Sequence, residues 1–422
     1  MPDLLTIAEA HVDALPLGER RSLLLRWADR IERRGEALAR LITAAVDKPI
    51  TLARTEVARA LITLRGTADA CRLLEPATLA LDGAGSATLH RVPIGPVLAV
   101  TPFNFPLNLA LHKLAPAIAA GAAAVWAPSP KAPGVAEAAL ELLRDAGAEP
   151  GLVQRCHDRE AVAAMAGDPR LGLLSFTGST EVGMRLRERT THARAVLELG
   201  SASAVILEQV ADPAAVAARV AWGASAFAGQ VCIKVQRIFV SEQRDDLVAA
   251  LAAAFAAIRC GPAEDPATVC GPLIDEAAAQ RVRGLLARLD ASSAVRLAGG
   301  TWQGRILAPT LYDRVPAHLP LAHSEEFFAP IAVIHRYADA DAALDGVELS
   351  PFGISAGIYA ADPALIARAF ARLRVGTLVV GDIPTRRDDR LPAGGMKRSG
   401  RGREGTLDTV LDYTETKVLW RP

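Results

Sequence analysis

The chain is organised around residues 229–237, Gly229-Gln230-Val231-Cys232-Ile233-Lys234-Val235-Gln236-Arg237. A single cysteine stands here among small and apolar residues. No second Cys or His lies within metal-ligand spacing of it, so the stretch predicts no metal site. A lone cysteine is most often a small buried hydrophobe, and its neighbours elsewhere in the chain must decide whether Cys232 is more than that.

Composition narrows the class of protein. The 422 residues are 51% hydrophobic and carry a formal net charge of +0. This length suffices for two domains with sizeable cores, and the neutral balance predicts no nucleic-acid partner. The five cysteines show no paired spacing, which favours a reducing compartment over a disulfide framework. No stretch resembles a membrane span or a signal peptide, so we expect a cytoplasmic protein without membrane contact.

Short apolar segments alternate with helical ones from residue 95 onward. This alternation is typical of an α/β protein with a parallel, doubly wound sheet. The pattern predicts strands at 96–100, 123–126, 152–156 and 171–176. Helices are expected at 107–121, 133–146, 159–166 and 180–189. No Gly-x-Gly-x-x-Gly follows these strands, so the standard dinucleotide fingerprint is absent.

A second α/β series follows residue 200. Its strands are expected at 204–207, 236–240, 331–337 and 377–380. Its helices are expected at 213–227, 246–258, 276–289 and 363–373. Outside the two series, the periodicity predicts helices at 23–44 and 54–74, and a terminal strand at 416–420. Residues 77–92 predict a β-hairpin with its turn at Asp82-Gly83-Ala84-Gly85.

Five further motifs accompany the cysteine stretch in a fixed order. They are Thr101-Pro102-Phe103-Asn104-Phe105-Pro106, Phe176-Thr177-Gly178-Ser179, Glu198-Leu199-Gly200-Ser201, Glu325-Glu326-Phe327-Phe328-Ala329-Pro330 and Gly394-Gly395-Met396-Lys397-Arg398-Ser399-Gly400. In this order and spacing the chain resembles the aldehyde dehydrogenase superfamily over nearly its whole length. Within it, the chain is most similar to the subgroup for lactaldehyde and phosphonoacetaldehyde.

The resemblance implies a domain layout. It implies a variant Rossmann domain for NAD(P), which lacks the usual fingerprint, at 1–77 and 94–200. An α/β catalytic domain would occupy 201–398. A small β element for oligomerisation would occupy 78–93 and 411–422, so we expect a homodimer or a homotetramer.

The resemblance also implies the catalytic residues. An aldehyde gives up hydride only after a nucleophile has added to its carbonyl carbon. Cys232 matches the family's thiol nucleophile, and Asn104 matches its side-chain donor to the oxyanion. Glu198 matches the general base that activates water for thioester hydrolysis. The family commonly has two glycines after Glu-Leu, and Ser201 replaces the second one here.

The same motifs imply a site for NAD or NADP. Gly178 and Ser179 end a strand and open a helix, whose free N–H groups suit a pyrophosphate. Ala127 stands where the family usually has a lysine that contacts the adenosine ribose. NAD and NADP therefore both stay open, and Lys131 is either a substitute or an ordinary surface lysine. The implied cofactor residues are Thr101, Pro102, Phe103, Pro128, Ser129, Gly178, Ser179, Val182, Leu199, Gly200, Glu326 and Phe328.

The implied substrate tunnel is basic. A guanidinium binds carboxylate, sulfonate, phosphate or phosphonate with two hydrogen bonds, so a basic tunnel favours a small anionic aldehyde as substrate. The alternative is that Arg386 and Arg387 lie on a surface loop and pair with the neighbouring Asp388 and Asp389. Arg390, on the same stretch, could do the same. The implied substrate residues are Phe105, His112, Ile233, Arg386 and Arg387.

The sequence thus predicts an NAD(P)-dependent aldehyde dehydrogenase that releases a free acid. Two other functions stay open. A CoA-acylating enzyme would pass the thioester to CoA, but members of that kind usually lack the glutamate found at Glu198. A catalytically weak binding or structural paralogue is supported only by Ala127.

Overall fold

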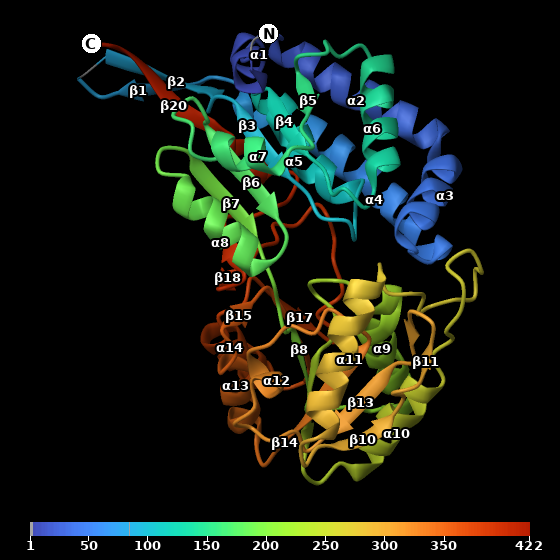
Figure 1. Cartoon of the computed structure of the whole chain (residues 1–422). Helices are drawn as coiled ribbons and strands as arrows, with labels where there is room; N and C mark the ends of the chain where they lie inside the picture. The colour runs from blue at the N-terminus through green and yellow to red at the C-terminus, as the bar shows by residue number, and fades with distance from the viewer. Residues whose placement is uncertain (1–2, 84) are drawn as a thin grey trace.

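The computed structural model describes residues 3–83 and 85–422 of the chain. Figure 1 shows two lobes, each built on its own β-sheet, and a slender extension that ends at the C-terminus. The predicted α/β class with parallel sheets is confirmed. Among the described residues, no helix is long and apolar enough to cross a membrane.

The sheet of the upper lobe has the strand order β19-β7-β6-β3-β4-β5. Its core strands are parallel, and only β19 (Gly400–Arg401) runs antiparallel, at the edge beside β7. The predicted strands are confirmed to within two residues at each end. The parallel strands are β3 (Val97–Val100), β4 (Ala124–Ala127), β5 (Val153–Arg155), β6 (Leu173–Thr177) and β7 (Arg194–Glu198).

Helices pack on this sheet around one large apolar core, which contains the fully buried Trp27 and Trp126. A buried carboxylate fixes the start of α5, because Glu56 accepts hydrogen bonds from the backbone N–H of Leu107 (2.9 Å) and Asn108 (3.1 Å). The helices of this lobe are α1 (Leu4–Ala10), α2 (Leu17–Arg33), α3 (Gly35–Val46), α4 (Ile50–Ala70), η1 (Cys71–Leu74), α5 (Asn108–Ala120), α6 (Pro133–Asp145), α7 (Arg159–Met165), α8 (Thr180–Arg189) and α15 (Asp408–Asp412).

The sheet of the lower lobe has the order β10-β13-β14-β9-β8-β16-β17, with only β10 antiparallel. Its strands are β8 (Ala204–Leu207), β9 (Arg237–Ser241), β10 (Val295–Ala298), β13 (Thr310–Asp313), β14 (Ile331–Tyr337), β16 (Ser355–Tyr359) and β17 (Thr377–Val380). Its helices are α9 (Pro213–Ser225), η2 (Ala226–Gly229), α10 (Asp245–Ala256), α11 (Glu276–Asp290), α12 (Pro320–His323), α13 (Ala340–Glu348) and α14 (Pro363–Arg372). Two small ribbons complete the lobe: β11 (Trp302–Gln303) with β12 (Ile306–Leu307), and β15 (Phe352–Gly353) with β18 (Met396–Lys397).

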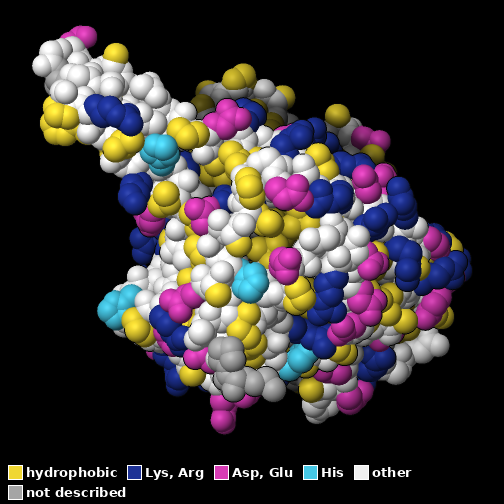
Figure 2. Space-filling view, turned by 90° about the horizontal axis from the view of Figure 1, so that it is seen from above, with side chains coloured by type: hydrophobic (Ala, Val, Ile, Leu, Met, Phe, Trp, Pro, Cys, Tyr) yellow, Lys and Arg dark blue, Asp and Glu magenta, His cyan; other side chains and the backbone are white. Residues whose placement is uncertain are grey.

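The slender extension is a three-stranded antiparallel sheet of β1 (Ala77–Leu81), β2 (Gly85–Pro93) and β20 (Thr414–Arg421). The hairpin predicted at 77–92 is confirmed, although Ala84 of its turn lies outside the described residues. Figure 2 shows the extension standing out from the body of the molecule. The terminal strand is longer than predicted because it pairs with β2 along eight positions.

Three predicted helices differ from the structure. The helix expected at 54–74 begins earlier, at Ile50, and its last turn is the 3-10 helix η1. The helix expected at 23–44 is two helices, since α2 and α3 are separated at Arg34, directly before Gly35. The helix expected at 213–227 ends at Ser225, because Ala226 leaves the helical conformation and Phe227 and Ala228 have left-handed backbone. Several short elements, including β13, β16 and α13, were not predicted, because their patterns are too short to separate a strand from a helix.

Candidate active site

Cys232 follows a strained turn. Phe227 and Ala228 have φ values of 54° and 52°, and Gly229 has φ 64°. Such backbone is unfavourable for residues with a side chain and occurs where the surrounding structure enforces it. At Gly229 a side chain would also collide with the backbone of Ala329, so only glycine fits there. The turn brings the half-buried Cys232 out of the lower lobe's core.

Asn104 connects the two lobes at this turn. Its side-chain Nδ2 donates a hydrogen bond of 2.9 Å to the carbonyl oxygen of Gln230, two residues before Cys232. The Gln230 side chain is itself fixed, since it accepts from the Ile274 N–H (2.9 Å) and donates to the Phe227 carbonyl (3.3 Å). The buried Asn104 amide therefore has a set orientation beside the cysteine loop, with one of its two N–H bonds used.

Glu198 is the last residue of β7, where it is buried and accepts a hydrogen bond of 3.2 Å from the Gly395 N–H. Burial raises the pKa of Glu198 to about 8, and repulsion from Glu404 adds to the effect. Arg387 and Lys113 act in the opposite direction. A carboxyl with this pKa exchanges its proton near neutral pH, which is what a general base requires.

The Cys232 thiol is disfavoured as a thiolate. Burial raises its pKa to about 12, and the negative charges of Glu198 and Glu326 add to that increase. Arg387 acts in the opposite direction and lowers the pKa of this thiol. The Cys232 thiol is therefore protonated in the protein alone and depends on added positive charge or a base to ionise.

The predicted cofactor residues come from both lobes. Those of the upper lobe follow the carboxyl ends of parallel strands, which is where open α/β sheets bind ligands. Glu326 and Phe328 come from the lower lobe, and the Phe328 ring lies edge-on to that of Phe103 with centroids 6.2 Å apart. The upper-lobe residues follow β3 (Thr101, Pro102, Phe103), β4 (Pro128, Ser129), β6 (Gly178, Ser179) and β7 (Leu199, Gly200), and Val182 lies exposed on α8.

Two features of this site fit a dinucleotide. The Glu326 carboxylate accepts one hydrogen bond of 2.9 Å from the Ser201 N–H, and its Oε2 has no partner among the described residues. A Cβ atom at position 200 would lie 2.7 Å from this oxygen and cover it. Because residue 200 is glycine, the oxygen stays accessible to a ribose hydroxyl. Helix α8 begins after Ser179, whose side chain makes no capping bond, and this leaves the helix N–H groups available to a pyrophosphate.

Ala127 ends β4 and is buried, while Lys131 is engaged elsewhere, in an ion pair with Asp275. Introducing the missing lysine by Ala127→Lys should therefore lower the KM for the dinucleotide. A hydrogen bond from a charged donor contributes roughly 1–2 kcal/mol, which corresponds to about 5- to 30-fold. Steady-state kinetics with varied NAD and NADP would measure the change. An unchanged or raised KM would show that the cofactor does not place its ribose beside position 127.

The two candidate tunnel arginines differ in their surroundings. Arg386 is 69% exposed and forms an ion pair of 3.1 Å with Asp382, so it lies at the surface, although its partner is neither Asp388 nor Asp389. Arg387 is only 15% exposed, its nearest carboxylate oxygen is on Asp389 at 3.5 Å, and it donates no hydrogen bond to any described residue. The third arginine of the loop, Arg390, is 72% exposed and pairs with Asp388. The inward-facing cation of this loop is Arg387.

The other predicted substrate residues lie nearby. Phe105 is half-buried, with the Lys48 ammonium 3.6 Å and the Arg59 guanidinium 5.5 Å from its ring centroid. His112 on α5 is completely buried and hydrogen-bonds Asp389 at 2.9 Å. Ile233 is half-buried directly after the cysteine.

Two residues of the site were not predicted. Arg59 on α4 forms a two-point ion pair with Asp389, at 2.7 and 2.8 Å, and lies close enough to Cys232 for the two groups to interact electrostatically. Asp389 was considered only as a surface partner, but it is buried. The two residues are 330 positions apart, so no local pattern could have joined them.

Comparisons with known proteins show the family and agree with the fold. The model of the aldehyde dehydrogenase family matches residues 6–419. The 3-sulfolactaldehyde dehydrogenase of Priestia aryabhattai is 32% identical over 409 residues, which cover 95% of this chain and 86% of the relative.

Two solved structures are similar throughout. Aldehyde dehydrogenase 21 from Physcomitrella patens, in complex with its reaction product succinate, has a TM-score of 0.94 at 32% identity and covers 99% of this chain and 89% of its own. The NADP-dependent glyceraldehyde-3-phosphate dehydrogenase from Bacillus halodurans C-125, complexed with NADP, has a TM-score of 0.94 at 33% identity. The match covers 99% of this chain and 90% of the Bacillus chain.

Proposed function

The chain belongs to the aldehyde dehydrogenase family, and from that premise we propose that it oxidises a small anionic aldehyde to the carboxylic acid with NAD or NADP. The observation that carries the anionic part is Arg387. Its guanidinium is largely buried, donates no hydrogen bond to the described residues, and acts electrostatically on both Cys232 and Glu198. A buried guanidinium with free donors is matched by an acceptor group on a ligand.

The similar proteins support this substrate class. The sulfolactaldehyde enzyme acts on an aldehyde that bears a sulfonate, the Physcomitrella enzyme holds the dicarboxylate succinate, and the Bacillus enzyme acts on a phosphate ester. Each of these substrates or products carries a negative group close to the reacting carbon. NAD and NADP both stay within the proposal.

In the proposed reaction, Cys232 Sγ adds as thiolate to the aldehyde carbon and forms a thiohemiacetal. The free N–H of the Asn104 amide and the backbone N–H of Cys232 would stabilise the oxyanion. A bound nicotinamide supplies the hydride acceptor, and its positive charge favours the thiolate. Loss of hydride leaves a thioester on Cys232, which water must then hydrolyse.

Glu198 would act in that second half. Its unprotonated carboxylate takes a proton from water as the water attacks the thioester carbon, and the acid product leaves with the thiolate regenerated. The raised pKa of about 8 makes Glu198 a stronger base than an ordinary carboxylate. The presence of Glu198 also favours hydrolysis over transfer of the acyl group to CoA.

The slender extension supports a homodimer or homotetramer as part of the proposal. Its β1 and β20 strands expose Leu79, Val418, Leu419 and Trp420, of which Trp420 is 58% exposed. Large apolar side chains gathered on a projecting sheet are typical of surfaces that a second protein chain covers.

Replacing Arg387 by leucine tests the anionic substrate. A two-point charge-assisted bond contributes roughly 2–4 kcal/mol to transition-state binding, so kcat/KM for an anionic aldehyde should fall by about 30- to 1000-fold. For a neutral aldehyde of similar size the loss should be small. Reduced-nicotinamide absorbance with sulfoacetaldehyde and with butanal measures both values.

Arg390→Leu is the matched control, since Arg390 lies three positions away on the same loop but is exposed and paired with Asp388. That variant should keep the wild-type preference. An equal loss of kcat/KM for both aldehydes in Arg387→Leu would contradict the assignment of Arg387 as the residue that binds the anionic group. No loss for either would favour the second candidate, oxidation of a neutral hydroxyaldehyde, which the resemblance to the lactaldehyde subgroup supports.

A further inference from the structure

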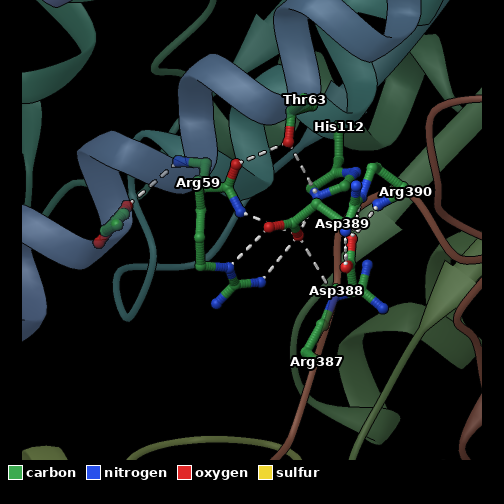
Figure 3. A network of polar contacts seen from close by, with 9 residues as sticks. Arg59, Thr63, His112, Arg387, Asp388, Asp389 and Arg390 are labelled. Carbon is green, nitrogen blue, oxygen red and sulfur yellow. Dashed lines mark hydrogen bonds and ion pairs between the residues drawn. The ribbon is translucent and has the colours of Figure 1, made fainter.

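The buried carboxylate of Asp389 contacts several polar side chains of the proposed tunnel. Asp389 accepts hydrogen bonds from Arg59, from His112 (2.9 Å) and from Asn108 (3.3 Å), and Arg387 lies 3.5 Å away. Figure 3 shows Arg59, His112 and Arg387 converging on the Asp389 carboxylate from two helices and the Arg387–Arg390 loop. The two helices are α4, which carries Arg59, and α5, which carries His112 and Asn108.

The single negative charge of Asp389 can neutralise only one of the two guanidinium ions, Arg59 and Arg387, that lie beside it. Arg59 meets both carboxylate oxygens, so this pair is a two-point ion pair with no net charge. His112 turns Nε2 toward the same carboxylate, and its Nδ1 is buried without a partner, as in a neutral ring. Burial lowers the pKa of His112, which keeps the ring neutral at physiological pH.

Arg387 is the cation of this group whose charge Asp389 does not cancel, and the Glu198 carboxyl that interacts with it is uncharged below its pKa of about 8. The other buried cations of the region have their own partners: Lys48 pairs with Glu56, and Lys113 pairs with Glu404 at 2.5 Å. The cluster of Arg59, Arg387, His112 and Asp389 therefore carries a net charge of about one positive unit, by summing two guanidinium ions, one carboxylate and one neutral ring.

We propose that Asp389 sets the charge of the pocket and thereby makes the enzyme select a singly charged anionic group over a doubly charged one. The inference rests on the proposed oxidation of an anionic aldehyde. Sulfonate and carboxylate carry one negative charge, whereas phosphate and phosphonate groups carry between one and two at neutral pH. The favoured substrate class is thus a sulfonate- or carboxylate-bearing aldehyde.

The physical reason is that the attraction to the pocket and the cost of desolvation depend differently on the ligand's charge. Attraction to a site of fixed charge grows linearly with the ligand's charge. The cost of removing that ligand from water grows with the square of its charge. With one positive unit in the pocket, doubling the ligand charge doubles the attraction but quadruples the desolvation cost. A second positive unit would benefit the dianion twice as much as the monoanion.

Sulfoacetaldehyde and phosphonoacetaldehyde form a matched pair of probes, because they differ in the charge of the terminal group and little in shape. The measurement is the ratio of kcat/KM for sulfoacetaldehyde to that for phosphonoacetaldehyde. It is made at about pH 7, where a second pKa near 6 leaves most of the phosphonate dianionic and Glu198 is still below its pKa of about 8. It is made for the wild type, Asp389→Asn, Arg59→Gln and the double variant. Butanal provides the neutral baseline for each enzyme.

We expect the wild type to favour sulfoacetaldehyde. Asp389→Asn adds one positive unit and should shift the ratio toward phosphonoacetaldehyde by about tenfold or more, from one unit charge acting at an effective dielectric constant near 20. Arg59→Gln removes one unit, so it should shift the ratio the other way and lower kcat/KM for both anions relative to butanal. The double variant restores one positive unit and should return to near the wild-type ratio.

A purely structural role for Asp389 would lower all three rates together and leave the ratio unchanged in every variant, which overturns the inference. The ratio is internal to each enzyme, so partial loss of folded protein cancels. If Asp389→Asn does not fold, the opposite shift in Arg59→Gln carries the test. A wild type that oxidises butanal as well as either anion would overturn the proposed function itself, whereas an anionic preference with no charge-dependent shift would overturn only this inference.

Discussion

Cys232→Ser should fold and bind the dinucleotide like the wild type but turn over less than about one per cent as fast. The serine hydroxyl is far less acidic than a thiol, and the structure already disfavours ionisation at this position, since the pKa of the Cys232 thiol is about 12. The strained turn at 227–229 and the Asn104–Gln230 hydrogen bond do not involve the sulfur, so the fold should survive. Steady-state rates and cofactor binding by fluorescence measure the two properties.

Cys260→Ser is the matched control, because Cys260 is likewise a free, half-buried cysteine of the lower lobe. It should retain wild-type activity. More than a few per cent of activity in the Cys232 variant, or a comparable loss in the Cys260 variant, would count against Cys232 as the nucleophile.

Glu198→Gln should separate the two halves of the reaction. Glutamine keeps the size of the side chain but cannot accept a proton from water, so thioester hydrolysis should slow by about 100-fold or more, the usual contribution of a general base. Rapid mixing with one equivalent of enzyme should still give a burst of reduced nicotinamide, followed by slow turnover.

The pH dependence supplies the control for Glu198. The carboxylate form is the base, and burial raises its pKa to about 8, so wild-type kcat should rise with pH through that value and then level. The variant should lack this rise. If the burst itself disappears in Glu198→Gln, the residue acts before hydride loss, for example in deprotonating Cys232, and the assigned role is wrong.

The elements and the cysteine motif could be predicted from sequence because both are local. Strands such as 204–207 and 331–337 match the structure at both ends, since short buried runs between turns have a clear pattern. The end of α9 could not be predicted, because nothing in Ala226-Phe227-Ala228 announces left-handed backbone. At the neighbouring Gly229 the backbone of Ala329 lies where a side chain would be, and no local pattern shows a contact with a residue so far along the chain.

The pocket's charge could not be predicted because it depends on distant contacts. Arg386, Arg387 and Arg390 look alike in sequence, and only the fold turns Arg387 inward while the others pair at the surface. Arg59 lies on a helix whose exposed arginines are ordinary, and its pairing with Asp389 appears only when α4 meets the loop near the C-terminus. Roles that depend on contacts between distant parts of the chain become visible only in the three-dimensional structure.

Mass spectrometry of Glu198→Gln after mixing with sulfoacetaldehyde and oxidised dinucleotide tests the central claim most directly. The account predicts one sulfoacetyl thioester per chain, mapped to the peptide that contains Cys232. The adduct should form only with the dinucleotide present, since without hydride loss the aldehyde adds reversibly and washes away. Reduced nicotinamide formed without an acyl adduct, or an adduct on another cysteine such as Cys260, would contradict the account.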